Sequence, residues 1–224
     1  MDASTAREFS RRLRAWFRRH HRDLPWRRTR DPYRILVSEL MLQQTQVSRV
    51  LEFYPRFLHR FPTVHHLAQA SPGHVREAWE GLGYYARARN LHALARHVTR
   101  DGGDGSLPAH PDALRALPGI GAYTAGAVAS FAYEKRAAAV DTNVARVLTR
   151  AFAPRLDPKR PRDLTRLWGI AERVLPRTGT ATWVHNQALM ELGALVCTAR
   201  VARCGACPVR TACKTGRKSK EDRS

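Results

Sequence analysis

The stretch ALRALPGIGAYTAGAVASF, residues 113–131, is typical of a helix, a tight turn and a second helix. Gly119 and Gly121 lie two residues apart in the turn, where glycine allows a positive φ and leaves the backbone N–H groups accessible. Because the second helix begins directly after them, its N-terminal dipole would add to the attraction for an anion. The turn therefore predicts a phosphate-binding site, and an ordinary connection between two helices is the alternative interpretation.

The chain around this turn is strongly basic. It has 224 residues, of which 39 are Lys or Arg and 19 are Asp or Glu, so its formal net charge is +20. Such an excess favours a nucleic-acid partner, because neutralised phosphates release condensed counterions. An anionic lipid surface and a merely soluble surface are the alternatives. The basic residues are spread along the whole chain, which suits a folded binding face better than a disordered arm.

The predicted fold class is all-α, because helical periodicity dominates and alternating β-branched stretches are scarce. With 43% hydrophobic residues, the chain can bury one large core or two small ones. Thr5 and Glu8 have the spacing of a capping box in the first helix, and Asp31 and Pro32 predict the start of the second. Further helices are expected at 47–60, 73–80, 85–100, 111–117, 122–133, 142–152, 162–175 and 182–197.

No targeting or membrane segment is recognisable in the sequence. The N-terminal stretch MDASTAREFSRRLRAWFRRHHR, residues 1–22, has no uninterrupted apolar segment, and no apolar run approaches the ~20 residues of a membrane span. We therefore expect an intracellular protein, cytoplasmic and nucleoid-associated, that contacts no membrane and acts as a monomer.

All four cysteines lie close together near the C-terminal end, at Cys197, Cys204, Cys207 and Cys213. Clustered thiols in a reducing compartment are typical of metal ligands rather than disulfides. Zinc sites usually pair two tight Cys-x2-Cys knuckles, whereas only Cys204 and Cys207 form one here. The spacing of six, two and five intervening residues therefore favours a [4Fe–4S] cluster, with zinc as the alternative.

Two carboxylates have surroundings that fit catalysis. Glu39 shares a helical face with Ile35, Leu36 and Leu42, so burial would raise its pKa and suit it to act as a general acid. A surface glutamate at the edge of the apolar stripe is the alternative. Asp141 precedes a helical pattern, and an N-cap aspartate that stays ionised could stabilise an oxocarbenium-like sugar. A simple helix cap is the alternative for Asp141.

Six segments together carry a family resemblance. They are LPWR at 24–27, SELMLQQTQV at 38–47, GLGYYARARNLH at 81–92, LPGIGAYTAGAV at 117–128, VDTNVARVL at 140–148 and the cysteine loop. In this order they resemble the helix–hairpin–helix (HhH-GPD) base-excision DNA glycosylases, and within that superfamily the MutY-like adenine glycosylases. The segments extend over nearly the whole chain, which makes the resemblance more specific than any single motif.

The resemblance implies a fold of two helical lobes with a DNA-binding cleft between them. A six-helix bundle with the helix–hairpin–helix motif would span residues 28–134. Residues 1–27 and 135–224 would form the second lobe, with the cluster loop at 197–213. MutY proteins usually continue into a further domain that recognises 8-oxoguanine, for which the residues after Cys213 leave no room. This expectation leaves open whether the chain is a fragment or a short natural member.

The resemblance also implies roles for four residues of the active site. Glu39 would protonate the adenine and then activate water, Asp141 would stabilise or trap the sugar cation, and Asn143 would help to orient the site. Tyr123 stands where bifunctional relatives carry a Schiff-base lysine, and we expect it to hydrogen-bond near Asp141 or the sugar. The chain has no lysine before Lys135, so we expect no lysine-based lyase activity.

Further positions are expected to contact double-stranded DNA that contains a mismatch or lesion. Gln44 and Tyr84 match the family's intercalating glutamine and tyrosine, which fill the space left when the target base is extruded. Arg87 is expected to contact phosphate, and a solvated side chain is the alternative. The complete set of expected DNA contacts is Gln43, Gln44, Tyr84, Arg87, Leu117, Gly119 and Gly121.

The implied activity is hydrolysis of the N-glycosidic bond of adenine mispaired with guanine or 8-oxoguanine. A glycosylase that removes thymine or uracil opposite guanine is one alternative, and the glutamines Gln43 and Gln44 favour adenine over it. A non-catalytic iron–sulfur DNA-binding module is the other alternative, and the presence of both Glu39 and Asp141 argues against it. Recognition of 8-oxoguanine and any redox role of the cluster are left open by the sequence.

Overall fold

A computed structural model describes residues 2–218, which divide into two compact units. One unit is the continuous segment Asp23–Tyr133, and the other combines the residues up to Arg22 with those from Glu134 onward. The predicted all-α fold class is confirmed, since the only β pairing in residues 2–218 is an isolated bridge between Cys197 and Ala202. The residues 23–27 that follow the first helix lie in the continuous unit, whereas the sequence analysis assigned them to the other.

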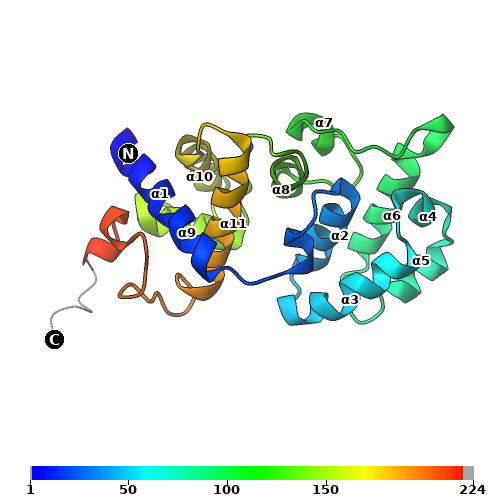
Figure 1. The fold of residues 1–224 in the computed structure, drawn as a ribbon, viewed down its shortest axis with the longest axis horizontal. Helices are drawn as coiled ribbons and strands as arrows, with labels where there is room; N and C mark the ends of the chain where they lie inside the picture. The colour runs from blue at the N-terminus through cyan, green and yellow to red at the C-terminus, as the bar shows by residue number, and fades with distance from the viewer. Residues whose placement is uncertain (1, 219–224) are drawn as a thin grey trace. The chain divides into compact units, whose positions relative to one another are not determined.

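The continuous unit is a bundle of seven α-helices within the described residues (Figure 1). In chain order its helices are η1 Pro25–Arg27, α2 Pro32–Leu42, α3 Val47–Arg60, α4 Val64–Gln69, α5 Pro72–Ala78, α6 Ala86–Val98, η2 Arg100–Gly102, α7 Pro111–Arg115 and α8 Ala122–Tyr133. The short helix α4 is absent from the six helices expected for this region. Its start is set by Thr63, whose side chain accepts a hydrogen bond from the His66 N–H.

Helix α2 is the central helix of this unit, and it packs against α3, α6 and α8. Its predicted start is confirmed, because Asp31 is the N-cap and accepts from the Arg34 N–H at 3.0 Å, and Pro32 is at the first helical position. All residues from 35 to 41 are buried, and they include the polar residues Ser38 and Glu39. These two side chains are therefore held in the interior of the bundle, whereas Arg34 in the first turn is exposed.

The discontinuous unit contains the first helix and the last third of the chain. Its helices are α1 Ala3–His20, α9 Thr142–Phe152, α10 Pro161–Val174, α11 Gly179–Leu195, η3 Arg210–Ala212 and η4 Gly216–Lys218. Helix α11 packs against both α1 and α9, and α9 also packs against α10. Their buried side chains form one continuous apolar core. Within residues 2–218, no helix is long and apolar enough to cross a membrane.

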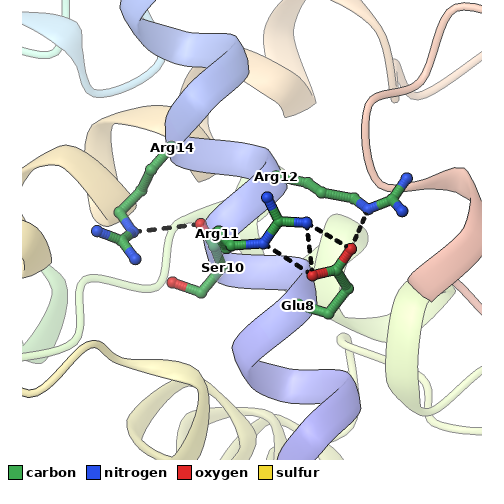
Figure 2. Close-up of polar contacts among 5 residues, drawn as sticks. All are labelled: Glu8, Ser10, Arg11, Arg12 and Arg14. Atoms are coloured by element: carbon green, nitrogen blue, oxygen red, sulfur yellow. Dashed lines mark hydrogen bonds and ion pairs between the residues drawn. The ribbon is translucent and has the colours of Figure 1, made fainter.

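The expected capping box of α1 is wrong. The helix begins at Ala3, and its N-cap is Asp2, whose carboxylate accepts from the Thr5 N–H at 3.1 Å. Glu8 is instead one turn further along and binds the guanidinium groups of Arg11 and Arg12 on the surface of the helix (Figure 2). Asp2, three positions before Thr5, also carries a side-chain oxygen that can cap a helix. It was therefore the stronger capping signal.

Two polar contacts anchor α1 and the residues just after it to α11. The Ser10 hydroxyl lies 2.9 Å from Nδ1 of His185, and both residues are buried. Arg22, just after the helix, donates from its backbone and guanidinium to the fully buried carboxylate of Glu191 at 2.8–3.0 Å. These contacts join residues that lie 169 and 175 positions apart in the chain.

Candidate active site

Glu39 lies on α2 with its side chain in the interior of the continuous unit, and it is only 4% exposed. Tyr123, in the first turn of α8, donates its hydroxyl to Oε2 of Glu39 at 2.6 Å. Tyr123 was expected to bond near Asp141 or the sugar; the structure gives its hydroxyl a partner that the sequence did not predict, Glu39, because α2 packs against α8. The arrangement is a buried carboxyl group whose orientation is held by a phenol.

Asp141 lies in the discontinuous unit, where it is the N-cap of α9. Its Oδ1 accepts from the Val144 N–H at 2.6 Å, and its Oδ2 accepts from the Asn143 side-chain amide at 3.0 Å. The simple N-cap interpretation thus holds for one oxygen, while the other oxygen is bound by the residue expected to orient the site. Both carboxylate oxygens of Asp141 are fixed in direction by this pair of donors.

Burial raises the pKa of Asp141 above the ordinary value of an aspartate. The Val144 N–H, the Asn143 amide and the charge of Arg146 act in the opposite direction and favour the ionised form. The sequence analysis considered only the cap, which stabilises the carboxylate. The structure adds an opposing cost of desolvation, which the two hydrogen bonds and the charge of Arg146 partly offset.

A chain of hydrogen bonds continues from Asn143 into the cysteine loop. Nη2 of Arg146 donates to Oδ1 of Asn143 at 2.7 Å and to the Gly193 carbonyl at 2.8 Å. Its Nε donates to the Cys197 carbonyl at 2.9 Å. Sequence analysis missed Arg146 and Gly193. The spacing of three residues between Asn143 and Arg146 on a helix was the one signal that could have indicated Arg146.

The four cysteines are half-buried and unpaired, so none forms a disulfide. Burial is the main cause that raises the pKa of the Cys207 thiol to about 11, and the charges of Cys197, Cys204 and Cys213 act in the same direction. The other three thiols therefore lie close enough to Cys207 to affect its ionisation. Within residues 2–218, however, no group of three or more His, Cys, Asp or Glu side chains is arranged to hold a metal ion.

Two sulfurs of this loop accept hydrogen bonds. Nη1 of Arg150 lies 3.3 Å from Sγ of Cys197, and the Gly216 N–H lies 3.3 Å from Sγ of Cys213. Donors of this kind stabilise thiolate, which is the form of cysteine that binds metals. The donor set of four thiols thus fits a metal cluster chemically.

The sequence suggested a positive φ at both glycines of the turn between α7 and α8. The structure shows a positive φ at only one of them. Gly119 has a φ of +74°, and a Cβ added there would lie 2.4 Å from Cβ of Asn90. Gly121 has no positive φ, and a Cβ there would meet nothing within 4 Å. In the described residues, neither glycine N–H has an acceptor. Leu117 closes the preceding turn by donating to the Leu114 carbonyl.

Gln44 and Tyr84 are both exposed residues in tight turns of the continuous unit, Tyr84 being 61% exposed. Both have a left-handed backbone, with φ of +56° at Gln44 and +46° at Tyr84. Gln43, by contrast, is half-buried and its side-chain amide donates to the Thr124 hydroxyl at 3.4 Å. These two turns present an amide and a phenol ring to solvent.

Arg87 does not have the position of a phosphate contact. It is 7% exposed, and its guanidinium donates to backbone carbonyls inside the continuous unit, including those of Leu40 and Leu82. Sequence analysis expected Arg87 to contact phosphate or to be solvated; arginine is seldom buried. Arg87 therefore lies on α6 and binds the backbone next to the two exposed turns from inside the unit.

A protein-family model covers more than half of the chain. The model described as the HhH-GPD superfamily base excision DNA repair protein matches residues 37–170, a range that includes Glu39, the turn at 117–121 and Asp141.

Curated relatives with sequence similarity include adenine DNA glycosylases. The chain is 49% identical over 201 residues to the adenine DNA glycosylase of Mycobacterium tuberculosis (strain ATCC 25618 / H37Rv), which covers 88% of this chain and 64% of that protein. It is 40% identical over 230 residues to the adenine DNA glycosylase of Homo sapiens, which covers 99% of this chain and 42% of that protein. The chain thus spans less than two thirds of the length of these relatives.

Solved structures share the fold. A thermostable thymine-DNA glycosylase matches with a TM-score of 0.86 and 31% identity, over 97% of this chain and all of that one. An endonuclease III bound non-covalently to DNA matches with a TM-score of 0.78 and 24% identity, over 97% of this chain and 98% of that one. The second similarity concerns the fold alone.

Proposed function

Because the chain belongs to the HhH-GPD superfamily of base excision DNA repair proteins, we propose that it is a monofunctional adenine DNA glycosylase. Its substrate is double-stranded DNA in which adenine is mispaired with guanine or 8-oxoguanine, and it acts as a monomer. The observation that carries the proposal is the buried Glu39 bound by Tyr123, in a chain 49% identical to an adenine DNA glycosylase. The residue types and their burial support proton transfer to a leaving base.

Glu39 supplies the proton that the leaving base needs. In this mechanism the carboxyl group protonates a ring nitrogen of the adenine, the C1′–N bond breaks, and its electron pair leaves with the base. The Glu39 carboxylate then accepts a proton from water, and the water oxygen bonds to C1′. The products are free adenine and an abasic site. The Tyr123 hydroxyl holds the carboxyl group in direction throughout.

Asp141 stabilises the positive charge that develops on the sugar as the base leaves. Its ionised form is favoured by the Val144 N–H and the Asn143 amide, which fix one oxygen each. Arg146 in turn holds Asn143, which makes Arg146 a positioning residue rather than a catalytic one. The proposal thus assigns the proton to Glu39 and the negative charge to Asp141.

The proposed activity stops at the abasic site. A β-elimination through a Schiff base needs an amine, and the hairpin position that would carry it is Tyr123. The first lysine of the chain is Lys135. Strand breaks should therefore arise only after the product is treated with alkali.

DNA binding in this proposal rests on the exposed turns of the continuous unit. The free N–H groups of Gly119 and Gly121 bind a phosphate, and the open space at Gly121 lets the phosphate approach the backbone. Gln44 and Tyr84 occupy the stack when the adenine is extruded. The net charge of +20 supports a polyanionic partner.

We also propose that Cys197, Cys204, Cys207 and Cys213 hold a [4Fe–4S] cluster. The support is the set of four neighbouring thiols and the donors to two of their sulfurs. When bound, the cluster would supply positive charge that offsets the burial of four thiolates and would tie the loop to the C-terminal end of α11. Iron and sulfide analysis of the purified protein, with zinc measured in the same sample, tests this assignment.

The test of the activity is base release from a panel of duplexes with A·G, A·8-oxoguanine, G·T and G·U pairs. Release of adenine without strand breaks before alkali supports the proposal. Glu39→Gln should abolish release while leaving duplex binding unchanged, because it keeps the shape and loses the proton. Unchanged turnover by this variant would contradict the acid assignment.

Removal of thymine opposite guanine is the second candidate. It is favoured by the similarity of the whole fold to a thermostable thymine-DNA glycosylase, with 31% identity. Faster release from G·T than from A·G in the same panel would support this candidate over adenine.

A further inference from the structure

Arg87 contacts two exposed turns that are far apart in the chain. One turn joins α2 to α3 and carries Gln44; the other joins α5 to α6 and carries Tyr84. The positive φ of both residues is unusual and unfavourable for residues other than glycine, so other contacts must hold both turns.

One nitrogen of the guanidinium serves the first turn. Nη1 of Arg87 donates to the Leu40 and Met41 carbonyls at 2.9 and 2.8 Å, and also to the Gln43 carbonyl. The Thr45 hydroxyl lies 3.1 Å from the same nitrogen. Two of these acceptors are carbonyls at the C-terminal end of α2, and the other two belong to the residues on either side of Gln44. The helix dipole favours a cation at the C-terminal end of α2.

The other nitrogen serves the second turn. Nη2 of Arg87 donates to the Leu82 and Gly83 carbonyls at 3.0 Å each, directly before Tyr84. The guanidinium also lies 5.5 Å from the ring centroids of both Tyr84 and Trp79. The indole N–H of Trp79 donates to the Gly83 carbonyl at 3.2 Å, so the same turn is held from two sides.

The charge of Arg87 is buried without a carboxylate among its hydrogen-bond partners in the described residues. Burial of a cation in this way is costly unless its donors are satisfied, and here carbonyl and hydroxyl oxygens satisfy them. Lysine could not replace it, because a single ammonium nitrogen cannot reach both sets of acceptors. The planar, forked shape of the side chain, rather than its charge alone, is what connects the turns.

We propose that Arg87 is a positioning residue that couples the two turns, so that Gln44 and Tyr84 enter the DNA stack as one unit. This inference rests on the proposed function, in which these two residues fill the space of the extruded base. Arg87 acts through the turns and does not touch the DNA.

The first test is a double-mutant cycle on the rate of base release under single-turnover conditions, using the duplex from which the wild type releases base. Arg87→Lys should lower the rate by roughly tenfold or more in the wild-type background, which corresponds to the loss of one or two charge-assisted hydrogen bonds. In a background of Gln44→Ala and Tyr84→Ala it should lower the rate less than about threefold, because there is nothing left to position. Equal losses in both backgrounds would overturn the proposal, since a general loss of stability is additive.

The second test does not depend on catalysis. Hydrogen exchange of the free protein should increase in Arg87→Lys at both turns together, at the Thr45 and Leu82 amides, which are bonded to the Leu42 and Trp79 carbonyls. Exchange that is unchanged, or increased at one turn only, would overturn the coupling. The matched control is Arg96→Lys, an exposed arginine on the same helix, which should change neither exchange nor rate. A wild-type protein that released no base at all would contradict the proposed function, and hydrogen exchange would still decide whether Arg87 couples the turns.

Discussion

Single atoms decide the chemistry of the two candidate catalytic groups. The Tyr123 hydroxyl is the only difference from a phenylalanine at that position, and it is the atom that contacts Glu39. In the same way, the Asn143 amide binds the second carboxylate oxygen of Asp141. Without it, only the oxygen that caps the helix would be bound. At this scale the predictions concern rates and pH dependence, because each change removes one hydrogen bond and little packing.

Replacing Tyr123 with phenylalanine should lower single-turnover base release about tenfold or more, because a buried carboxyl group loses the donor that orients it. Duplex affinity should stay within about twofold of the wild type. The matched control is Tyr54→Phe in the same unit, which removes a hydroxyl that donates to the Arg34 carbonyl at 3.2 Å. That control should lower stability and leave the rate unchanged; a Tyr123 variant with the wild-type rate would show that the contact has no catalytic role.

Replacing Asn143 with alanine removes a donor that lowers the pKa of Asp141, so that pKa should rise further above its ordinary value. Because the ionised form is the one that stabilises the sugar cation, the acid limb of the pH–rate profile should move to higher pH. The rate at neutral pH should fall roughly tenfold. Thr142→Ala, the exposed neighbour on α9, is the control; an acid limb that does not move in Asn143→Ala would refute this account of the hydrogen bond.

The sequence predicted the burial of Glu39 and the N-cap position of Asp141, because an apolar stripe and a helix start are local patterns. Whether these two residues are catalytic stays a prediction. The partner of Tyr123 and the burial of Arg87 could not be predicted, since each depends on the packing of helices whose contacting residues lie 84 and 47 positions apart in the chain. Long-range packing is the information that local periodicity lacks.

At the scale of the helices, α9 and α11 pack directly against each other in the discontinuous unit. A Cβ added at Gly193 on α11 would lie 2.7 Å from Cβ of Asn143 and 3.2 Å from its carbonyl oxygen. Glycine at this point lets the two helices meet where Asp141 and Asn143 are held. The spacing of α9 and α11 is therefore part of the geometry of the candidate site.

Gly193→Ala should destabilise the protein by about 1–3 kcal/mol, because the added methyl group has no room against the backbone of α9. The matched control is Gly169→Ala within α10, where the nearest atom to an added Cβ is the flexible end of Arg173 at 3.4 Å. That change should be neutral or stabilise by up to about 1 kcal/mol through helix propensity. Urea unfolding followed by circular dichroism measures both, and equal stabilities of the two variants would contradict the steric argument.

Most helix starts were predictable because capping residues act locally, as Asp31 with Pro32 shows. The exceptions have local causes too. Helix α4 is only 6 residues long, too short for its periodicity to be distinguished from a loop. For α1, two possible caps compete three residues apart, and the carboxylate of Asp2 holds the Thr5 N–H.

For the whole molecule, a buried histidine of the core contributes to the dependence of stability on pH. His185 is fully buried beside Ser10, and burial lowers its pKa from 6.5 to about 3. The folded protein therefore holds this imidazole neutral at pH values where an unfolded chain would bind a proton. Stability from this group is complete above about pH 6.5 and is lost as the pH falls toward 3.

His185→Gln should remove this dependence. Between about pH 6 and pH 4 the free energy of unfolding of the wild type should fall more steeply than that of the variant, by up to about 1.4 kcal/mol per pH unit. Chemical denaturation at a series of pH values measures the difference in slope. Parallel curves for the two proteins would mean that His185 binds a proton equally well in the folded and unfolded states.

The order in which the two halves of the discontinuous unit leave the ribosome has a consequence for biosynthesis. Helix α1 is made first, but the His185 that pairs with its Ser10 is made 175 residues later. At about 5–20 residues per second, an amphipathic helix with five buried positions would wait roughly 10–35 s for the surface that covers it. During that interval the continuous segment Asp23–Tyr133 is complete and free to fold, while the nascent α1 exposes Phe9, Leu13 and Phe17 to chaperones.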